Sequence, residues 1–308
     1  MGERTRVAAI VGPTAVGKTD VSLQVAEVLS AEIVSTDSMQ AYRGMDIGTA
    51  KPTPAQRQLI AHHLVDVFDP SEDVTAAQFQ TLARAAIEDI DRRGHLPLLV
   101  GGSGLYFRSV VDDLRFPPRS GEVRASLERE AEEMGAERLH ARLRELDPAA
   151  ASKMEPGNAR RVVRALEVIE LTGQPFSEND SWERFESRYD LTVAGLELDR
   201  QVLYDRIAAR VDRMLADGLA REVHALARTG LGRTARQALG YRQILEAPVD
   251  AAADELREGI VRATKRFARR QESWFRSDPR IRWYDAGRDD VGERLTELFH
   301  GSPEAEPS

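Results

Sequence analysis

The segment VAAIVGPTAVGKTD, residues 7–20, decides the fold that this sequence predicts. An apolar run at 7–11 leads into eight residues that fit the pattern G-x-x-x-x-G-K-[ST] at every position: Gly12, Pro13, Thr14, Ala15, Val16, Gly17, Lys18 and Thr19. A helical pattern follows, so the segment predicts a strand, a phosphate loop and a helix. In such loops the glycines let backbone N–H groups face an anion, and the helix adds the positive end of its dipole. We therefore predict phosphate binding at residues 12–19.

Two side chains of this loop have expected roles. Lys18 neutralises the outer phosphate, and the hydroxyl of Thr19 ligates Mg²⁺, the cofactor that we expect. The pattern is that of ATP-binding and other nucleotide-binding proteins. The alternative is a glycine-rich turn with a solvated lysine, which explains neither the apolar run nor the spacing.

The composition excludes several classes of protein. The chain has 308 residues, 42% of them hydrophobic, which is enough to bury a substantial core. No apolar run is long enough to span a bilayer, and residues 1–6 lack the apolar segment of a signal peptide, so we expect a soluble, cytoplasmic protein with no membrane partner. The absence of cysteine excludes disulfides, thiolate metal sites and cysteine nucleophiles. The adjacent pair His62-His63 fits partly exposed strand or loop histidines better than a metal site.

The charge of the chain is unevenly distributed. The net charge is −8, but residues 199–284 carry 18 Lys and Arg against 12 Asp and Glu. This segment therefore has a charge of +6 and the remainder −14. A polyanion would meet a local basic patch on an acidic protein.

Apolar runs and helical periodicity alternate along the first 115 residues. We expect strands near 6–11, 32–36, 64–68 and 96–100, helices at 18–30 and 75–93, and a further strand at 191–198. A capping box at Thr75 and Gln78 begins the second helix, and Gly94 ends it. This alternation predicts an α/β fold with a parallel sheet and helices on both faces. The catalytic core comprises 1–115 and 190–284, a helical insertion occupies 116–189, and 285–308 form an acidic, largely disordered tail.

Asp37 follows directly after the strand expected at 32–36. Ligands of open α/β sheets bind at the carboxyl ends of the strands, so Asp37 and the phosphate loop should share one crevice. Asp37 can bind Mg²⁺ through water or accept a proton from a nucleophile; the alternative is a turn cap. The strand at 96–100 ends in glycines and Ser103 rather than in a magnesium-directed aspartate, which weakens the interpretation as a nucleotide hydrolase.

Residues 262–276, RATKRFARRQESWFR, form a basic amphipathic helix. Six cations fall within an arc of roughly 140° on a helical projection: Arg262, Lys265, Arg266, Arg269, Arg270 and Arg276. A solvated basic face is the alternative, but with few acidic partners on the helix we favour a nucleic-acid backbone. Further basic groups lie at Arg160, Arg161 and Arg164, at Arg206, Arg210 and Arg213, and around Gly240 at Arg236, Tyr241 and Arg242. Tyr241 either stacks on a base or is a half-buried helix residue.

The motifs together resemble one family. The segments GPTAVGKT, STDSMQAYRGMDIGTAKPT, HHLVDVFDP, LPLLVGGSGLYF, ARRVVRALEV, GYRQ and ATKRFARRQESWFR follow in the order and spacing of the bacterial tRNA dimethylallyltransferases, also called tRNA isopentenyltransferases. The resemblance covers residues 6–284. It implies a P-loop core and transfer of a dimethylallyl group from dimethylallyl diphosphate to N6 of adenosine 37 in tRNA, with release of diphosphate.

The resemblance also implies roles for individual residues. Thr14 to Thr19 cradle the diphosphate, Lys18 and Arg210 neutralise its charge as it departs, and Asp37 is the general base. The implied tRNA contacts are Asp37, Ser38, Met39, Gln40, Ser103, Arg124, Arg160, Arg161, Arg164, Gly240, Tyr241 and Arg242, with Arg266, Arg269 and Arg270 nearby. The helical insertion grips the anticodon stem-loop, and the adenosine enters a channel opposite the donor. Ser103 and Gly104 stand where relatives often have other residues, and the lack of cysteine excludes the zinc finger of eukaryotic relatives.

Three other functions also account for part of the sequence. An adenylate prenyltransferase shares the donor site but acts on a free nucleotide, and the basic helix disfavours it. A small-molecule kinase and a non-catalytic RNA-binding NTPase explain the phosphate loop but neither DSMQ nor DIGTAKPT. We expect the chain to act as a monomer.

Overall fold

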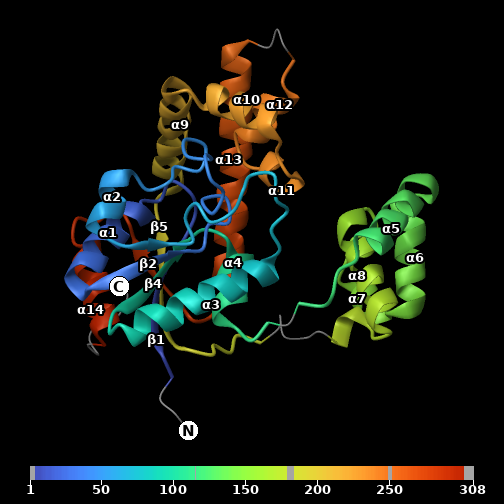
Figure 1. Ribbon diagram of the computed structural model, residues 1–308, viewed down its shortest axis with the longest axis horizontal. Helices are drawn as coiled ribbons and strands as arrows, with labels where there is room; N and C mark the ends of the chain where they lie inside the picture. Colours follow the sequence, from blue (N-terminus) through green and yellow to red (C-terminus); the bar gives the residue numbers. More distant parts are fainter. Residues whose placement is uncertain (1–3, 115, 179–183, 249–251, 302–308) are drawn as a thin grey trace. The chain divides into compact units, whose positions relative to one another are not determined.

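The computed structural model describes residues 4–114, 116–178, 184–248 and 252–301 (Figure 1). It contains two compact units. The first comprises Met1–Asp112 and Ser187–Ser308, and the second is the continuous segment Asp113–Glu186. The boundaries expected for the insertion, 116 and 189, each lie three residues after those of the second unit.

A six-stranded parallel sheet lies at the centre of the described part of the first unit, in the order β3-β2-β4-β1-β5-β6. The strands are β1 (Arg6–Val11), β2 (Ala31–Ser35), β3 (His62–His63), β4 (Leu96–Gly101), β5 (Asp190–Glu197) and β6 (Ile281–Asp285). Five of the six residues of β1 are buried, because β1 pairs with β4 on one side and β5 on the other and both faces are covered.

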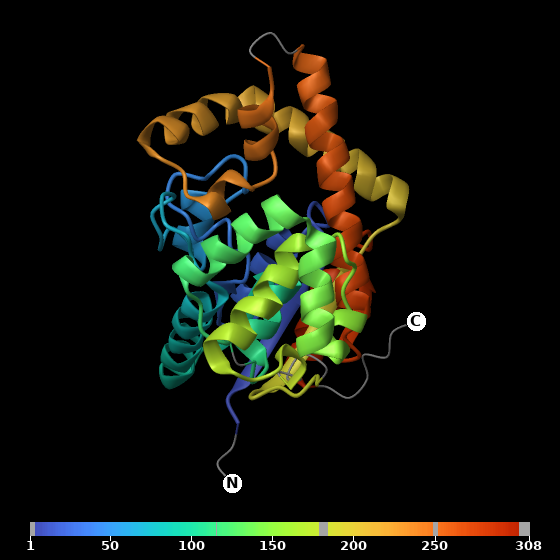
Figure 2. The same cartoon turned by 90° about the vertical axis from the view of Figure 1, so that its right-hand side faces the viewer.

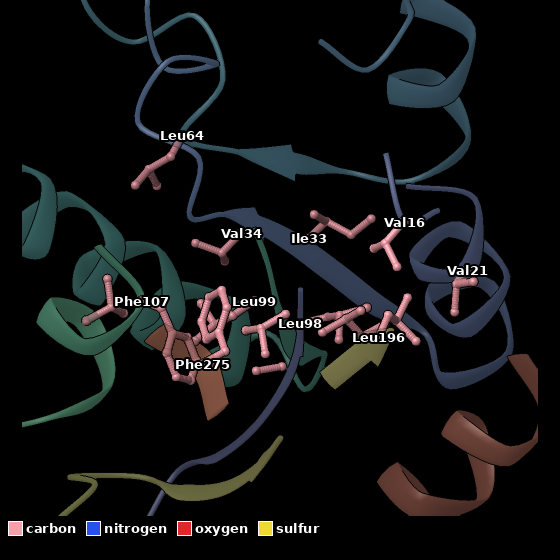
Figure 3. Close-up of a cluster of buried hydrophobic side chains, with 14 of the residues drawn as sticks. Val16, Val21, Ile33, Val34, Leu64, Leu98, Leu99, Phe107, Leu196 and Phe275 are labelled. Atoms are coloured by element: carbon pink, nitrogen blue, oxygen red, sulfur yellow. The ribbon is translucent and has the colours of Figure 1, made fainter. Parts of the chain in front are cut away.

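Helices cover both faces of this sheet, which confirms the predicted fold class. The described helices of this unit are α1 (Lys18–Leu29), α2 (Pro54–Leu59), α3 (Ala76–Arg92), α4 (Gly104–Val111), α9 (Arg200–Asp217), α10 (Leu219–Thr229), α11 (Arg233–Arg236), α12 (Tyr241–Glu246), α13 (Ala253–Arg276) and α14 (Val291–His300). Side chains alternate along each strand. Val34 and Leu99 point toward Phe107 and Phe275, whereas Ile33 and Leu98 lie on the side of the phosphate loop (Figure 3).

Helices α9, α10, α12 and α13 of the same unit lie on the side of the sheet where the strands have their carboxyl ends (Figure 1). These helices extend beyond that edge of the sheet, and α13 runs as one long helix from the sheet to the end of this group (Figures 1 and 2). α13 packs on α9 and on α12. None of the helices within the described ranges is both long and apolar enough to cross a membrane.

The local signals for α3 are confirmed. Thr75 Oγ1 accepts from the N–H of Gln78, and Gln78 Oε1 accepts from the N–H of Thr75, which completes the predicted capping box. Gly94 follows the helix with a φ of 79°, a left-handed conformation that glycine adopts without strain.

The strand expected at 64–68 is wrong. Of residues 62–68, His62 and His63 alone pair with β2, because Leu64 and Asp66 have φ values of 62° and 59° and turn the chain away from an extended path. Both histidines are half-buried, and His63 contacts Glu32 at 2.7 Å. Among the described residues no cluster of three or more His, Cys, Asp or Glu can hold a metal ion. The pair forms β3, the edge strand beside β2.

The expected acidic tail at 285–308 is also wrong where the chain is described. Asp285 ends β6, and α14 follows and packs on α1. Apolar residues recur with helical spacing between the acidic residues of this segment. Val291, Leu295 and Leu298 are all buried and lie on one face of α14. Residues 302–308 lie outside the described residues.

The second unit is a small helical bundle with its own core. Its helices are α5 (Gly121–Met134), α6 (Ala136–Leu146), α7 (Pro148–Ser152) and α8 (Ala159–Thr172), followed by the 3₁₀ turn η1 (Phe176–Glu178). α5 and α6 both pack on α8. Leu127, Leu139, Leu143, Val162 and Leu166 form the centre of its apolar cluster.

Candidate active site

The phosphate loop joins β1 to α1 and has the backbone that anion binding requires. Gly12, Ala15 and Gly17 have φ values of 145°, 66° and 111°, and such left-handed residues turn successive N–H groups to one side. A Cβ on Gly12 would lie 2.6 Å from the carbonyl oxygen of Leu196, so only glycine fits between β1 and β5. Val16 is fully buried and anchors the loop in the core.

Lys18 lies inside the loop, as the sequence predicts. Its Nζ donates to the carbonyl oxygens of Gly12 (2.9 Å) and Pro13 (2.7 Å). Burial lowers the pKa of Lys18 to about 7; the nearby Asp37 carboxylate opposes this shift, and the Arg210 guanidinium adds to it. A bound anion stabilises the protonated form, so Lys18 is suited to a negatively charged ligand.

A cavity of about 440 Å³ opens over the loop, and its charges suit a polyanion. Residues of the loop line one side, among them Thr14 and Thr19, while Arg206, Arg210 and Arg213 reach it from α9. Burial lowers the pKa of Arg210, although the neighbouring Asp37 opposes this shift. All three arginines of this basic group therefore line the cavity.

Asp37 lies in this cavity together with Lys18 and Arg210. Its Oδ1 accepts from the N–H of Met39 at 3.0 Å, so the carboxylate does cap its own turn. Oδ2 makes no hydrogen bond with any residue in the described ranges. The turn cap and a chemical role are therefore compatible, because they use different oxygens.

A second cavity of about 270 Å³ shares several of the same residues. Thr14, Asp37 and Arg210 line both cavities, whereas Ser38, Met39, Ser103 and Arg270 line only the second, and Gln40 lines only the first. Asp37 therefore lies where two openings meet. A third recess, of about 40 Å³, also touches Thr14 and Arg210 and is otherwise largely aliphatic.

Gln271 is a residue of this site that the sequence reasoning missed. It is buried on α13, where its Nε2 donates to the carbonyl of Gly102 (2.7 Å) and its Oε1 accepts from the N–H of Thr14 (2.9 Å). It thereby ties the phosphate loop to the end of β4. The available signal was a polar residue on the apolar face of the basic helix, one turn from Phe267 and from Phe275.

The glycines after β4 are explained by the same helix. A Cβ on Gly102 would lie 2.2 Å from Gln271 Nε2, and one on Gly104 would lie 2.0 Å from the ring of Trp274. Side chains of α13 therefore approach these glycines closely. Gly104, noted as a departure from the family pattern, is required by the indole beside it.

The turn at Gly240 differs from the expected role of its tyrosine. Tyr241 has no exposed surface, and its hydroxyl donates to Glu222 at 2.6 Å, so the ring cannot stack on a base. Of the two alternatives for Tyr241, the stacked ring is therefore wrong and the buried helix residue is confirmed. Gly240 lines the aliphatic recess, and Arg242 pairs with Glu246 at 3.0 Å.

The basic face of α13 is partly neutralised at its ends. Arg262 pairs with Glu258 and Arg276 with Glu197, while Lys265 lies over the ring of Tyr204. Arg266, Arg269 and Arg270 are exposed and form no ion pair with any of the described residues. The centre of this face is therefore the part available to an anionic partner.

The arginines of the second unit fall into two groups. Arg160 and Arg161 are exposed in the first turn of α8. Arg124 and Arg164 instead approach the fully buried carboxylate of Glu167, at 3.9 and 2.8 Å. Arg164 also donates to the carbonyls of Pro117 and Pro118. Arg124 and Arg164 therefore balance a charge inside this unit.

Comparison with known proteins agrees with the motifs. The family model described as IPP transferase matches residues 40–278. The tRNA dimethylallyltransferase of Kineococcus radiotolerans is 53% identical over 94% of this chain and 95% of its own length, and that of Streptomyces coelicolor is 52% identical over 92% and 91%.

Solved structures give the same result. The crystal structure of the tRNA isopentenylpyrophosphate transferase of Bacillus halodurans has a TM-score of 0.71 at 39% identity, covering 98% of this chain and 97% of that one. A eukaryotic dimethylallyltransferase described as acting on tRNA has a TM-score of 0.83 at 26% identity, covering 98% of this chain and 82% of that one. With its motifs, its fold and its site all in agreement, this chain belongs to the IPP transferase family.

Proposed function

We propose that this chain transfers a dimethylallyl group from dimethylallyl diphosphate to N6 of adenosine 37 in tRNA and releases diphosphate. The observation that carries the proposal is the position of Asp37, which lines two cavities with shared lining residues, one of them cationic and built on the phosphate loop. The first cavity receives the donor and the second the adenosine. Membership of the family and the names of the relatives support the reaction class.

Each part of the site has a task in this reaction. The adenosine N6 attacks C1 of the allylic group, the C1–O bond breaks, and the bond's electrons leave with the diphosphate. Lys18 and Arg210 stabilise the negative charge that develops on the leaving group. The proton from N6 passes to Oδ2 of Asp37, the oxygen that its turn does not use. The aliphatic recess beside Thr14 and Arg210 suits the dimethylallyl group.

The donor atoms present fit Mg²⁺. Thr19 and Asp37 offer oxygen ligands to the same cavity, and Mg²⁺ prefers oxygen and completes its shell with phosphate oxygens and water. Thr19 would hold the ion. When bound, Mg²⁺ supplies positive charge that partly neutralises the diphosphate. The chain acts as a monomer in this proposal.

The contacts to tRNA divide between the two units. Asp37 to Gln40 and Ser103 contact the target adenosine, and Arg266, Arg269 and Arg270 contact the backbone. In the second unit, Arg160 and Arg161 contact the anticodon stem-loop, because they are exposed at a helix start, where the helix dipole also favours phosphate.

The test is a single-turnover incubation with radiolabelled dimethylallyl diphosphate, Mg²⁺ and an anticodon stem-loop RNA. A matched RNA with guanosine at position 37 is the control, alongside AMP and ATP. We expect label on the adenosine RNA alone. Label on AMP alone would indicate an adenylate prenyltransferase, and label on none of the acceptors would contradict a prenyl transferase altogether.

A further inference from the structure

Glu222, on α10, accepts four hydrogen bonds with one carboxylate. Its Oε2 accepts from the N–H groups of Asp46 (2.9 Å) and Ile47 (2.8 Å). Its Oε1 accepts from the N–H of Gly48 (3.1 Å) and from the hydroxyl of Tyr241 (2.6 Å). Three consecutive backbone N–H groups that converge in this way form an anion-binding concavity. Here the anion is a side chain of the protein itself, 174 residues along the chain from Gly48.

The charge of this carboxylate, and not only its shape, is required. All four partners are donors, and an ionised carboxylate is a pure acceptor. Burial and the hydrogen bond to Glu222 raise the pKa of Tyr241, so its phenol keeps the proton that it donates. A glutamine would offer one oxygen and one NH₂ group. In either orientation the NH₂ group would face at least one backbone N–H and leave it unpaired.

Close packing against α10 and α12 also restricts the segment that Glu222 binds. A Cβ on Gly48 would lie 2.5 Å from the ring of Tyr241 and 2.9 Å from Leu219. Gly48 is thus pressed against α10 and α12 while its N–H binds the carboxylate. The position of residues 46–48 is therefore fixed both by hydrogen bonds from their backbone N–H groups to Glu222 and by packing around Gly48.

The next residues of this segment form a wall of the active site. Thr49 and Ala50 line the cationic cavity together with Asp37. Their carbonyl oxygens accept from Gln40 Nε2 at 3.3 and 3.5 Å, and Gln40 Oε1 accepts from Ser35 Oγ at 3.0 Å. The position of Gln40, three residues after Asp37, therefore depends on where this wall lies.

We propose that Glu222 is a positioning residue for prenyl transfer: its charge fixes residues 46–50, and these in turn fix Gln40 beside Asp37. Glu222 does not line either of the two cavities that share Asp37, so its effect passes through residues 46–50, of which Gly48, Thr49 and Ala50 line these cavities. The inference rests on the proposed function. Small errors in the placement of reacting groups are costly even when binding is unchanged.

The test compares Glu222→Gln, Glu222→Asp and the wild-type chain in steady-state transfer to the stem-loop RNA. We expect Glu222→Gln to lower kcat by about 10²-fold while the donor KM and the RNA Kd change by less than about threefold. Glu222→Asp keeps the charge and should recover part of kcat. Glu27→Gln, at an exposed position on α1, is the matched control and should behave as wild type.

Amide hydrogen exchange, read by mass spectrometry, tests the same inference without turnover. Glu222→Gln should speed exchange in a peptide covering residues 45–50 and leave β1 and β4 protected. Wild-type kcat in Glu222→Gln, or equally faster exchange in β1 and β4, would overturn the positioning role. A wild-type chain that transfers no label would instead contradict the proposed function, and the exchange result would still decide whether Glu222 holds the wall.

Discussion

The carboxylate of Asp37 caps its own turn through one oxygen, and we propose that the other oxygen takes up the reacting proton. Asp37→Asn separates these tasks, because the amide oxygen can still accept from the N–H of Met39 while the side chain can no longer take up a proton. We expect kcat to fall by about 10²–10⁴-fold, the range for loss of a general base, with tRNA affinity nearly unchanged. Single-turnover rates and filter binding measure the two quantities. Full turnover in this variant would exclude Asp37 as the base.

Lys18 gives donor binding a pH dependence with a defined sign. Its pKa is lowered to about 7, and a bound diphosphate favours the charged form, so binding raises that pKa. Below pH 7 the lysine is already protonated and adds no pH dependence. Above pH 7 binding must take up a proton, and affinity should weaken by up to about tenfold per pH unit until the pKa of the bound state is reached.

Calorimetric titration of dimethylallyl diphosphate from pH 7 to 9, in two buffers of different ionisation enthalpy, measures this proton uptake. Lys18→Arg is the control, because a guanidinium does not titrate in this range. Its affinity should lack the decline attributed to Lys18. Equal slopes for the two proteins would show that the decline comes from another group.

At the scale of single elements, α13 contributes both to the phosphate-loop site and to the basic surface. Its buried face carries Gln271, which contacts the phosphate loop, and its exposed face carries Arg266, Arg269 and Arg270. One helix therefore connects the donor site to the basic surface. A change on one face should leave the other face intact.

The double variant Arg266→Gln/Arg269→Gln tests the exposed face. Each neutralised phosphate contributes about 0.7–0.9 to the slope of log K against log salt, so the slope should fall by about 1.5. The donor KM should stay unchanged, because neither arginine lines the donor cavity. Arg92→Gln/Arg288→Gln, at exposed positions outside α13, is the matched control. An unchanged salt slope would mean that the basic face is simply solvated.

At the scale of the whole molecule, β6 and α14 are part of the folded first unit, because β6 pairs with β5 and α14 packs on α1. Leu295 has no exposed surface and lies in the face of α14 that packs on α1. Leu295→Ala should lower the free energy of unfolding by about 2–5 kcal/mol, the usual cost of truncating a buried leucine. Glu297→Ala, on the exposed side of the same helix, should change it little. Urea denaturation measures both, and equal stability of the two variants would contradict the packing of α14.

A feature of this molecule can be predicted from the sequence when the residues that determine it are close together along the chain. The phosphate loop, the capping box at Thr75 and the position of Asp37 are all determined within a few neighbouring residues, and each was found. The burial of Tyr241 depends on Glu222 and Gly48, which are remote in sequence, so a local reading could not decide between a stacked and a buried ring. The left-handed turns at Leu64 and Asp66 carry no glycine signal, and the apolar run there imitates a strand.

The order of the strands also has a consequence for biosynthesis. β1 is made first, but its partners β4 and β5 begin at Leu96 and Asp190, so the central strand stays incomplete until most of the chain has been translated. The helical segment Asp113–Glu186 is continuous, carries its own apolar cluster and leaves the ribosome before β5 does. Because domains generally fold as units during synthesis, this segment can fold first. The apolar residues of β1 must meanwhile be kept from aggregating, a period in which chaperones matter most.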